Sequence, residues 1–206
     1  MNVLAIGAHP DDLELGCAGT LARHVAEGDR VTLLVVTSGQ AGPGDVALRE
    51  NEAREAASVL GADVVFGGLP DGSVSRYELE LVHLVEEVVR STGADVVYTH
   101  GQKDSHQDHR AVALASMGAC RGVQRLLCYD SPSSVAFSPS VFVDITTTLD
   151  KKVAALQAHE TQVGHSAMAS VSLVRTQAGY RGFQSRCEAA EGFEPLRLVL
   201  SMGGAL

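Results

Sequence analysis

Short apolar runs alternate with longer segments of helical periodicity through the first half of the chain. The apolar runs are residues 2–7, 31–37, 63–66 and 95–99. The segments that repeat apolar side chains at helical spacing are residues 15–25, 47–60 and 77–91. Strands that are apolar throughout are typical of a parallel sheet covered by helices on both faces. The pattern therefore predicts a doubly wound, mainly parallel α/β fold.

The second half of the chain has a less regular pattern. The strands expected there are residues 125–129, an alternating segment at 141–145, and residues 196–200. A helix capped by Thr147 or Thr148 is expected to run to about Gln162. Residues 163–192 give weak signals, so we expect loops. Without repeats or linkers, residues 1–206 are expected to form a single domain around one core.

Charge and composition limit the kinds of binding partner and the cellular compartment that we expect. The formal net charge of −9 disfavours nucleic acid and anionic membranes, because both would be repelled. No apolar stretch approaches the length of a membrane span, and the first apolar run lacks a preceding basic segment. The four cysteines are scattered without a Cys-x-x-Cys pair, which is typical of thiols in a reducing compartment. We therefore expect a cytoplasmic protein.

A first polar cluster follows the first predicted strand. His9, Asp11 and Asp12 come directly after that strand, at the edge of a doubly wound sheet where ligands bind. Adjacent carboxylates repel each other unless a cation or protons compensate, and a divalent metal is the simplest compensation. Imidazole with carboxylate suits zinc, and also iron or cobalt. The alternative is helix N-capping, which explains only one of the two aspartates.

A second cluster follows the fourth predicted strand. His106, Asp108 and His109 lie beyond residues 95–99, so parallel strands bring them to the same edge as the first cluster. Two His/Asp clusters at one edge are difficult to explain as surface decoration. His100 ends the strand itself and is a weaker candidate, with a structural role as its alternative.

The two clusters together supply the parts of a hydrolytic metal site. A catalytic zinc has three protein ligands and an open position for water, and His9, Asp12 and His109 are the expected ligands. Asp11 then remains as general base, and His106 stabilises the oxyanion or protonates the leaving amine. Asp108 is expected to hold an imidazole in the required tautomer.

Residues 8–17 and 106–109 also carry a resemblance to a known family. Ala-His-Pro-Asp-Asp-Leu-Glu-Leu-Gly-Cys resembles the Ala-His-Pro-Asp-Asp-Glu signature of the PIG-L/LmbE-like deacetylases, and His-Gln-Asp-His resembles their His-Pro-Asp-His signature. Weaker matches are residues 69–72, 159–162, 181–182 and 191–193. The resemblance implies a Rossmann-like fold and zinc-dependent hydrolysis of N-acetyl groups on N-acetylglucosamine-type sugars.

The resemblance also implies roles for residues outside the two clusters. It implies that Arg49 and Asp71 contact substrate, with a solvated helix charge as the alternative for Arg49. Leu13 and Gln107 depart from the family pattern without removing a predicted ligand. Asp104 stands where some members carry a mobile tyrosine that assists the oxyanion, and Tyr129 or Tyr180 are the candidates to replace it.

The expected function is hydrolysis of an N-acetyl amide on an amino sugar, glycoside or related small polar molecule. The alternatives are a metal-dependent hydrolase of another acyl or thiol-conjugate amide, and a zinc-containing sugar-binding module without catalysis. A dinucleotide-dependent enzyme is disfavoured because the first strand lacks Gly-x-Gly-x-x-Gly. The short chain suggests either an open site or a site that a partner subunit completes, so a homo-oligomer is one candidate assembly.

Overall fold

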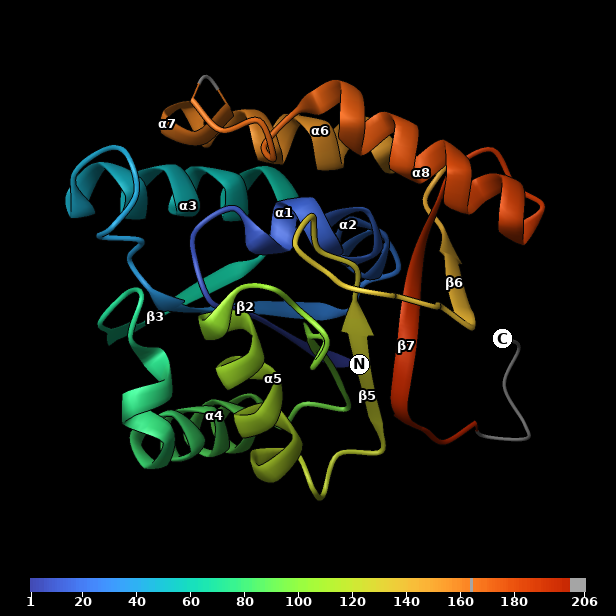
Figure 1. Cartoon of the computed structure of the whole chain (residues 1–206). Helices are drawn as coiled ribbons and strands as arrows, with labels where there is room; N and C mark the ends of the chain where they lie inside the picture. Colours follow the sequence, from blue (N-terminus) through green and yellow to red (C-terminus); the bar gives the residue numbers. More distant parts are fainter. Residues whose placement is uncertain (164, 201–206) are drawn as a thin grey trace.

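The computed structural model describes residues 1–163 and 165–200 and contains a seven-stranded sheet (Figure 1). The strand order is β3-β2-β1-β4-β5-β7-β6. The first five strands are parallel, whereas β7 runs antiparallel to both of its neighbours. The strands are β1 (Asn2–Gly7), β2 (Arg30–Thr37), β3 (Asp63–Leu69), β4 (Val96–His100), β5 (Arg125–Tyr129), β6 (Val141–Asp144) and β7 (Ala190–Leu198). The predicted α/β fold with a mainly parallel sheet is confirmed.

Helices cover both faces of the sheet (Figure 1). One face carries α1 (Asp12–Gly16), α2 (Ala18–Ala26), α3 (Val46–Leu60), α6 (Leu149–Gln157), α7 (Glu160–Val163) and α8 (Val171–Ser185). The other carries the 3-10 helix η1 (Val74–Tyr77), α4 (Glu78–Thr92) and α5 (Gln107–Ala119). None of the helices in the described parts of the chain is long and apolar enough to cross a membrane.

The central strands β1, β2, β4 and β5 are mostly apolar because they lie between two cores. In β1, Val3 and Ala5 pack into the core beneath α2, while Leu4 and Ile6 pack into the core against α4 and α5. Successive side chains of a strand point to opposite faces, so a strand buried on both faces has no polar alternation. This double burial is the physical reason that the pattern revealed the sheet.

Two expectations for the second half of the chain are wrong. Residues 171–185 form α8, although loops were expected there, because its buried stripe consists of Val174, Ala178 and Gly182. A stripe this narrow gives little periodic signal, and a Cβ on Gly182 would approach the Glu188 carbonyl oxygen to 2.5 Å. The last strand begins at Ala190 rather than residue 196, because a buried carboxylate, Glu191, disguises its apolar pattern.

Two expected helices are also divided. The segment expected as one helix at residues 15–25 begins earlier and breaks at Cys17, whose backbone leaves the helical region. The helix expected to reach Gln162 stops at Gln157, and residues 160–163 form the separate helix α7.

A buried ion pair connects β7 to the helices above it. Glu191 accepts hydrogen bonds from the backbone N–H groups of Gly19 (3.0 Å) and Thr20 (2.7 Å), at the start of α2. Its carboxylate lies 2.5 Å from Lys152 Nζ, which also donates to the Leu15 carbonyl oxygen at 2.8 Å. Both side chains of the pair are almost fully buried. Removal of either side chain would therefore leave the other charge buried without its ionic partner, which is energetically costly.

We expect Glu191→Ala to lower the free energy of unfolding by about 3–5 kcal/mol, because it leaves the Lys152 ammonium buried and unpaired. Urea unfolding followed by circular dichroism measures this loss. The matched control is Glu27→Ala, which removes one partner of the exposed Arg23–Glu27 pair and should change stability by no more than about 1 kcal/mol. Equal losses in the two variants would contradict the role given to the buried pair.

Candidate active site

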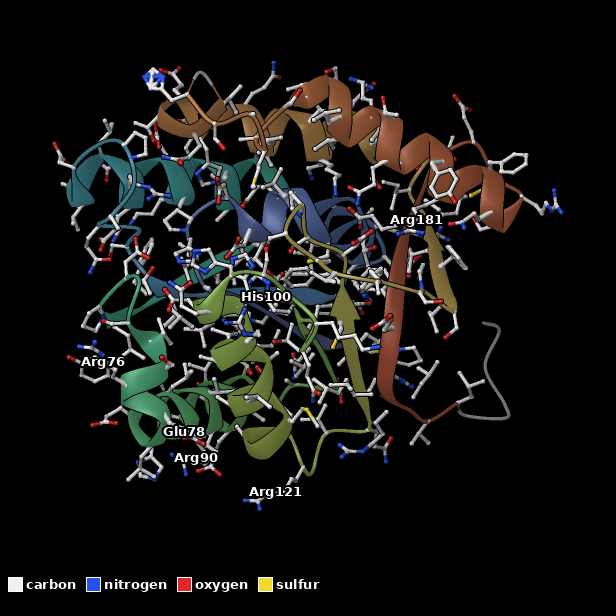
Figure 2. The ribbon with its side chains drawn as sticks, in the orientation of Figure 1. Arg76, Glu78, Arg90, His100, Arg121 and Arg181 are labelled. Atoms are coloured by element: carbon white, nitrogen blue, oxygen red, sulfur yellow. The ribbon has the colours of Figure 1, made fainter. Side chains whose placement is uncertain are left out.

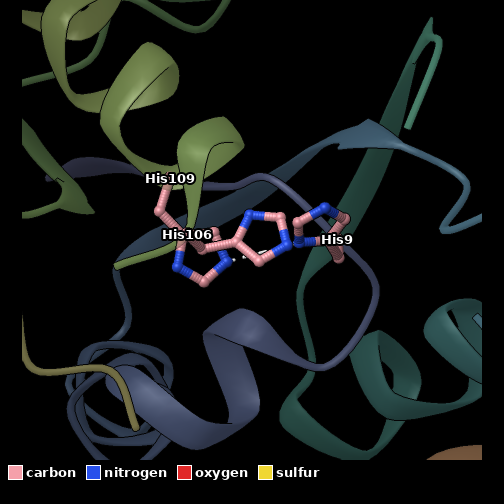
Figure 3. A group of neighbouring side chains, drawn as sticks. All are labelled: His9, His106 and His109. Atoms are coloured by element: carbon pink, nitrogen blue, oxygen red, sulfur yellow. Dashed lines mark hydrogen bonds between the residues drawn. The ribbon is translucent and has the colours of Figure 1, made fainter. Parts of the chain in front are cut away.

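A pocket of about 440 Å³ opens at the carboxyl edge of the parallel strands. The predicted site residues that line it are His9, Asp11, Asp12, Arg49, Asp71, His106 and His109. Asp108 is fully buried beside the pocket. The loops that follow β1, β3 and β4 thus bring together residues nearly 100 positions apart in the sequence. In Figure 3 the rings of His9, His106 and His109 converge on one another.

The turn after β1 has an unusual backbone at Asp11. Its φ of 98° is uncommon for a residue with a side chain. Asp12 holds this turn by accepting a hydrogen bond from the His9 backbone N–H at 2.7 Å. Asp11 occupies the N-cap position of α1, but its side chain makes no capping hydrogen bond. N-capping therefore does not explain this carboxylate.

Three side chains have the spacing of metal ligands. His9 Nδ1 lies 3.4 Å from Asp12 Oδ2 and 3.3 Å from His109 Nε2, and His109 Nε2 lies 3.3 Å from Asp12 Oδ1. Figure 3 marks the contact between the two imidazoles. Ligands bound to zinc at about 2.0–2.1 Å in a tetrahedron stand about 3.3–3.4 Å apart. Asp12 presents Oδ2 to His9 and Oδ1 to His109, so the two imidazoles and this carboxylate form a compact donor set that fits a divalent metal ion such as zinc.

The electrostatics of the cluster also favour a cation. Burial lowers the pKa of His9, but hydrogen bonds to Asp108, Asp12 and Asp71 outweigh it and raise the pKa to about 12. His109 behaves in the same way: burial opposes its charge, yet Asp12 and Asp104 raise its pKa to about 9. The surrounding carboxylates thus stabilise positive charge at this position, which a divalent cation would supply.

The pKa values of the two adjacent aspartates shift in opposite directions. Burial, followed by the neighbouring Asp12 charge, raises the pKa of Asp11 to about 7. Burial also acts to raise the pKa of Asp12, but His109 and His100 outweigh it and hold that pKa well below its usual range. Separation of this kind between neighbouring acids is typical of sites that divide acid and base work between two carboxyl groups.

Asp71 and Asp108 both contact the outer nitrogen of His9. Asp71 Oδ1 lies 3.0 Å from His9 Nε2, and its Oδ2 accepts a hydrogen bond from the Ala41 backbone N–H. Asp108 Oδ2 lies 3.4 Å from the same nitrogen, and its carboxylate accepts from the N–H groups of Gly72 and Val74. The structure thus places Asp71, predicted to bind substrate, beside Asp108 as a support of His9.

Arg49 is not a solvated helix charge, because it is only 4% exposed. Its terminal nitrogens donate to the carbonyl oxygens of Gly39 and Pro10. The loop after β2 is thereby fastened to the His9–Pro10 turn. Gly39 makes this possible: its φ is +66°, and a Cβ there would collide with the guanidinium.

Sequence reasoning missed other parts of the site. Asp104 is buried against His109, and Glu14 forms a buried pair with His159, whose Nε2 lies 3.3 Å from its carboxylate. His159 had appeared in the sequence only as a weak motif match. Neither proposed substitute for the mobile tyrosine lines the pocket: the Tyr129 hydroxyl donates to the Ile6 carbonyl oxygen, and Tyr180 lies exposed on α8.

His100 supports the cluster from inside the sheet. Figure 2 shows it in the interior of the molecule, and its ring is fully buried. The ring stacks on His109 with the centroids 3.9 Å apart, and its Nε2 lies 3.1 Å from Asp12 Oδ2. Burial lowers the pKa of His100 to about 4, so the ring is neutral at neutral pH.

Comparison with known proteins identifies the class. The family described as PIG-L, GlcNAc-PI de-N-acetylase, matches residues 4–120, more than half of the chain. The uncharacterised deacetylase YaiS of Escherichia coli (strain K12) is 36% identical over 168 residues, covering 78% of this chain and 91% of that protein. The fold, the site and these matches define an N-deacetylase. The chain belongs to the PIG-L family, as its two signatures predicted.

The chain is also similar to a sugar deacetylase in sequence and to a hydratase in fold. The diacetylchitobiose deacetylase of Thermococcus kodakarensis is 27% identical over 217 residues, covering 93% of this chain and 81% of that protein. The crystal structure of GalB, the 4-carboxy-2-hydroxymuconate hydratase of Pseudomonas putida KT2440, superposes with a TM-score of 0.86 over the full length of both chains. Its sequence identity is 22%, so this likeness shows the fold alone.

We expect Gly39→Ala to destabilise the protein by about 1–3 kcal/mol, because it places a side chain at positive φ against the Arg49 guanidinium. The control is Gly118→Ala in α5, where an added Cβ meets no atom within 4 Å, and which should stabilise by up to about 1 kcal/mol. Urea midpoints measured on both variants check the prediction. A Gly39→Ala midpoint at or above that of the wild type would show that the loop does not need this glycine.

Proposed function

We propose that this protein is a divalent-metal-dependent hydrolase, with zinc as the metal, that removes the acetyl group from an uncharged N-acetylated amino sugar or glycoside. The observation that carries the proposal is the close approach of His9 Nδ1, the Asp12 carboxylate and His109 Nε2, all within 3.4 Å of one another, beside the otherwise unassigned carboxylate of Asp11.

His9, Asp12 and His109 would hold the metal, and the same donors suit iron or cobalt. A zinc ion in such a site polarises an amide carbonyl and lowers the pKa of water. The support for these three ligands lies in their mutual distances and in the carboxylates that contact the outer nitrogens of both histidines.

Asp11 is the general base of the proposed reaction. With a pKa near 7, it is ionised in a large share of molecules at neutral pH and still basic enough to take a proton from water. Asp12, whose pKa is held low, stays ionised and does not compete for that proton. The proton then passes to the departing amine.

His106 is the proposed donor to the developing oxyanion. Its Nδ1 accepts a hydrogen bond from the Asp108 backbone N–H, at the start of α5. The neutral ring must therefore carry its proton on Nε2, which leaves this N–H free to donate. Burial, followed by positive charge at His9 and His109, lowers the pKa of His106, so the ring is neutral at neutral pH. A metal cation held by those two rings would replace their charge and act in the same direction.

The charge of the pocket supports an uncharged substrate. Among the described residues that line it, Arg49 is the only lysine or arginine, and its terminal nitrogens already bind backbone carbonyls. Figure 2 shows Arg76, Arg90 and Arg121 extending from the periphery of the molecule. The lining offers hydroxyl and amide groups that suit sugar hydroxyls: Ser105, Gln107, Ser133, Gln162 and Ser166. A phosphorylated sugar would meet several carboxylates and, among the described lining residues, no lysine or arginine with free terminal nitrogens to bind its phosphate.

We expect the zinc-loaded protein to release primary amine from N-acetylglucosamine glycosides or diacetylchitobiose, and to lose this activity with a chelator until zinc is restored. Fluorogenic amine detection gives kcat/KM for each member of a panel. N-acetylglucosamine 1-phosphate and a nucleotide sugar should react at least about tenfold more slowly, because the carboxylates repel them. No amine from any member would overturn the deacetylation of sugars, whereas a preference for the phosphorylated sugars would overturn only the uncharged class.

Two substitutions separate the base from the metal ligands. Asp11→Asn should lower kcat by about 10²–10⁴-fold and leave the zinc content unchanged, because the variant lacks only the proton acceptor. His109→Ala should lose both activity and zinc. Metal analysis and amine release are measured on the same samples, with Asp63→Asn, an exposed aspartate at the start of β3, as the matched control. Near-normal turnover in Asp11→Asn would exclude Asp11 as the base.

A further inference from the structure

Asp104 stands where some members of the family carry a mobile tyrosine, so the sequence suggested that this chain lacks one catalytic group. The structure shows a buried carboxylate, 5% exposed, with both oxygens bonded. Oδ1 accepts a hydrogen bond from the His106 backbone N–H at 2.8 Å. Oδ2 lies 3.1 Å from His109 Nδ1 and accepts a hydrogen bond from the Ser131 hydroxyl at 2.6 Å.

We propose that Asp104, held by Ser131, is the positioning carboxylate that fixes the ring and tautomer of the metal ligand His109. The inference rests on the metal centre of the proposed function, but not on which amide that centre hydrolyses. It assigns both residues a role in metal affinity rather than a direct contact with substrate.

The tautomer follows from the chemistry of the partners. An ionised carboxylate only accepts hydrogen bonds, so His109 Nδ1 must carry the proton that faces Asp104. The opposite nitrogen, Nε2, then has its lone pair free, and this nitrogen lies 3.3 Å from both His9 Nδ1 and Asp12 Oδ1. A carboxylate on the outer nitrogen of a histidine ligand also raises the basicity of the ring toward the metal.

Ser131 keeps Asp104 in place from a different loop. Its hydroxyl is buried and comes from the segment after β5, whereas Asp104 follows β4. The Ser105 N–H donates to the Ser133 carbonyl oxygen (3.0 Å), and the Val135 N–H donates to that of Lys103 (2.7 Å), so backbone hydrogen bonds join the two loops. A swing of the carboxylate toward the pocket would break its hydrogen bonds with the Ser131 hydroxyl and the His106 N–H.

The two proposed histidine ligands are thus supported by different carboxylates. His9 is backed by Asp71 and Asp108, from the β3–η1 connection and α5, while Asp104 backs His109. Ser133 adds a hydroxyl 3.1 Å from His109 Nδ1, a second contact on the same outer nitrogen. Loss of Asp104 leaves the hydrogen bonds of His9 intact, so its effect on the metal is partial rather than complete.

The test is zinc affinity, measured by competition with a chromophoric chelator on the full chain. Asp104→Asn should weaken zinc binding about 10–100-fold, and Ser131→Ala should weaken it less, because the carboxylate remains. The double variant should bind zinc no more weakly than Asp104→Asn alone, since Ser131 acts through Asp104. The matched control is Glu50→Gln, which changes another carboxylate that accepts a serine hydroxyl (Ser38, 2.7 Å) away from the cluster. Its affinity should equal that of the wild type.

Each outcome has one meaning. Folded Asp104→Asn with a zinc affinity within twofold of the wild type would overturn the proposal, even if its melting temperature had fallen. If Asp104→Asn does not fold, Ser131→Ala decides in the same way: wild-type affinity overturns the proposal, and weakened affinity supports it. A shifted visible spectrum of the Co²⁺-loaded Ser131→Ala protein would support an altered His109 ligand. Failure of the wild type itself to bind zinc would instead overturn the proposed metal centre.

Discussion

Carboxylate charge concentrated at one edge of the sheet is the constraint on which the rest of this site depends. Five aspartates meet there around two histidines: Asp11, Asp12, Asp71, Asp104 and Asp108. Such a group of carboxylates is stable only beside positive charge, and the strongly raised pKa of His9 expresses that requirement. A divalent cation satisfies it while leaving the imidazoles neutral and able to act as ligands.

The fold meets this constraint by drawing on several loops. Parallel strands deliver the residues after β1 and β4 to one place, because their carboxyl ends lie at one edge. Backbone N–H groups then neutralise part of the charge: Ala41 donates to Asp71, Gly72 and Val74 donate to Asp108, and His106 donates to Asp104. A buried carboxylate is neutralised in a similar way outside the site: Glu191 accepts hydrogen bonds from backbone N–H groups at the start of α2 and from Lys152.

The buried carboxylates that contribute to the packing of the fold also hold the side chains of the proposed active site. Asp104 and Asp108, which contact His109 and His9, are buried and accept hydrogen bonds from neighbouring backbone N–H groups. In the proposed metal site, such a support would keep the two imidazoles in place while Asp11 gains and loses a proton.

The sequence by itself determined the sheet and the two signatures, because doubly buried strands are apolar throughout and residues that follow such strands gather at one edge. The sequence therefore predicted His9, Asp12 and His109 as neighbours, whereas the structure showed that Asp11 stands at the N-cap of α1 without a capping hydrogen bond. The side chains that contact His9 and His109 from the protein interior could be identified only from the tertiary structure. Asp71 contacts His9, Asp104 faces His109 through a loop held by Ser131, and α8 packs through Val174, Ala178 and Gly182. These contacts join residues far apart in the chain, or depend on a stripe of small side chains, so no local pattern carries them.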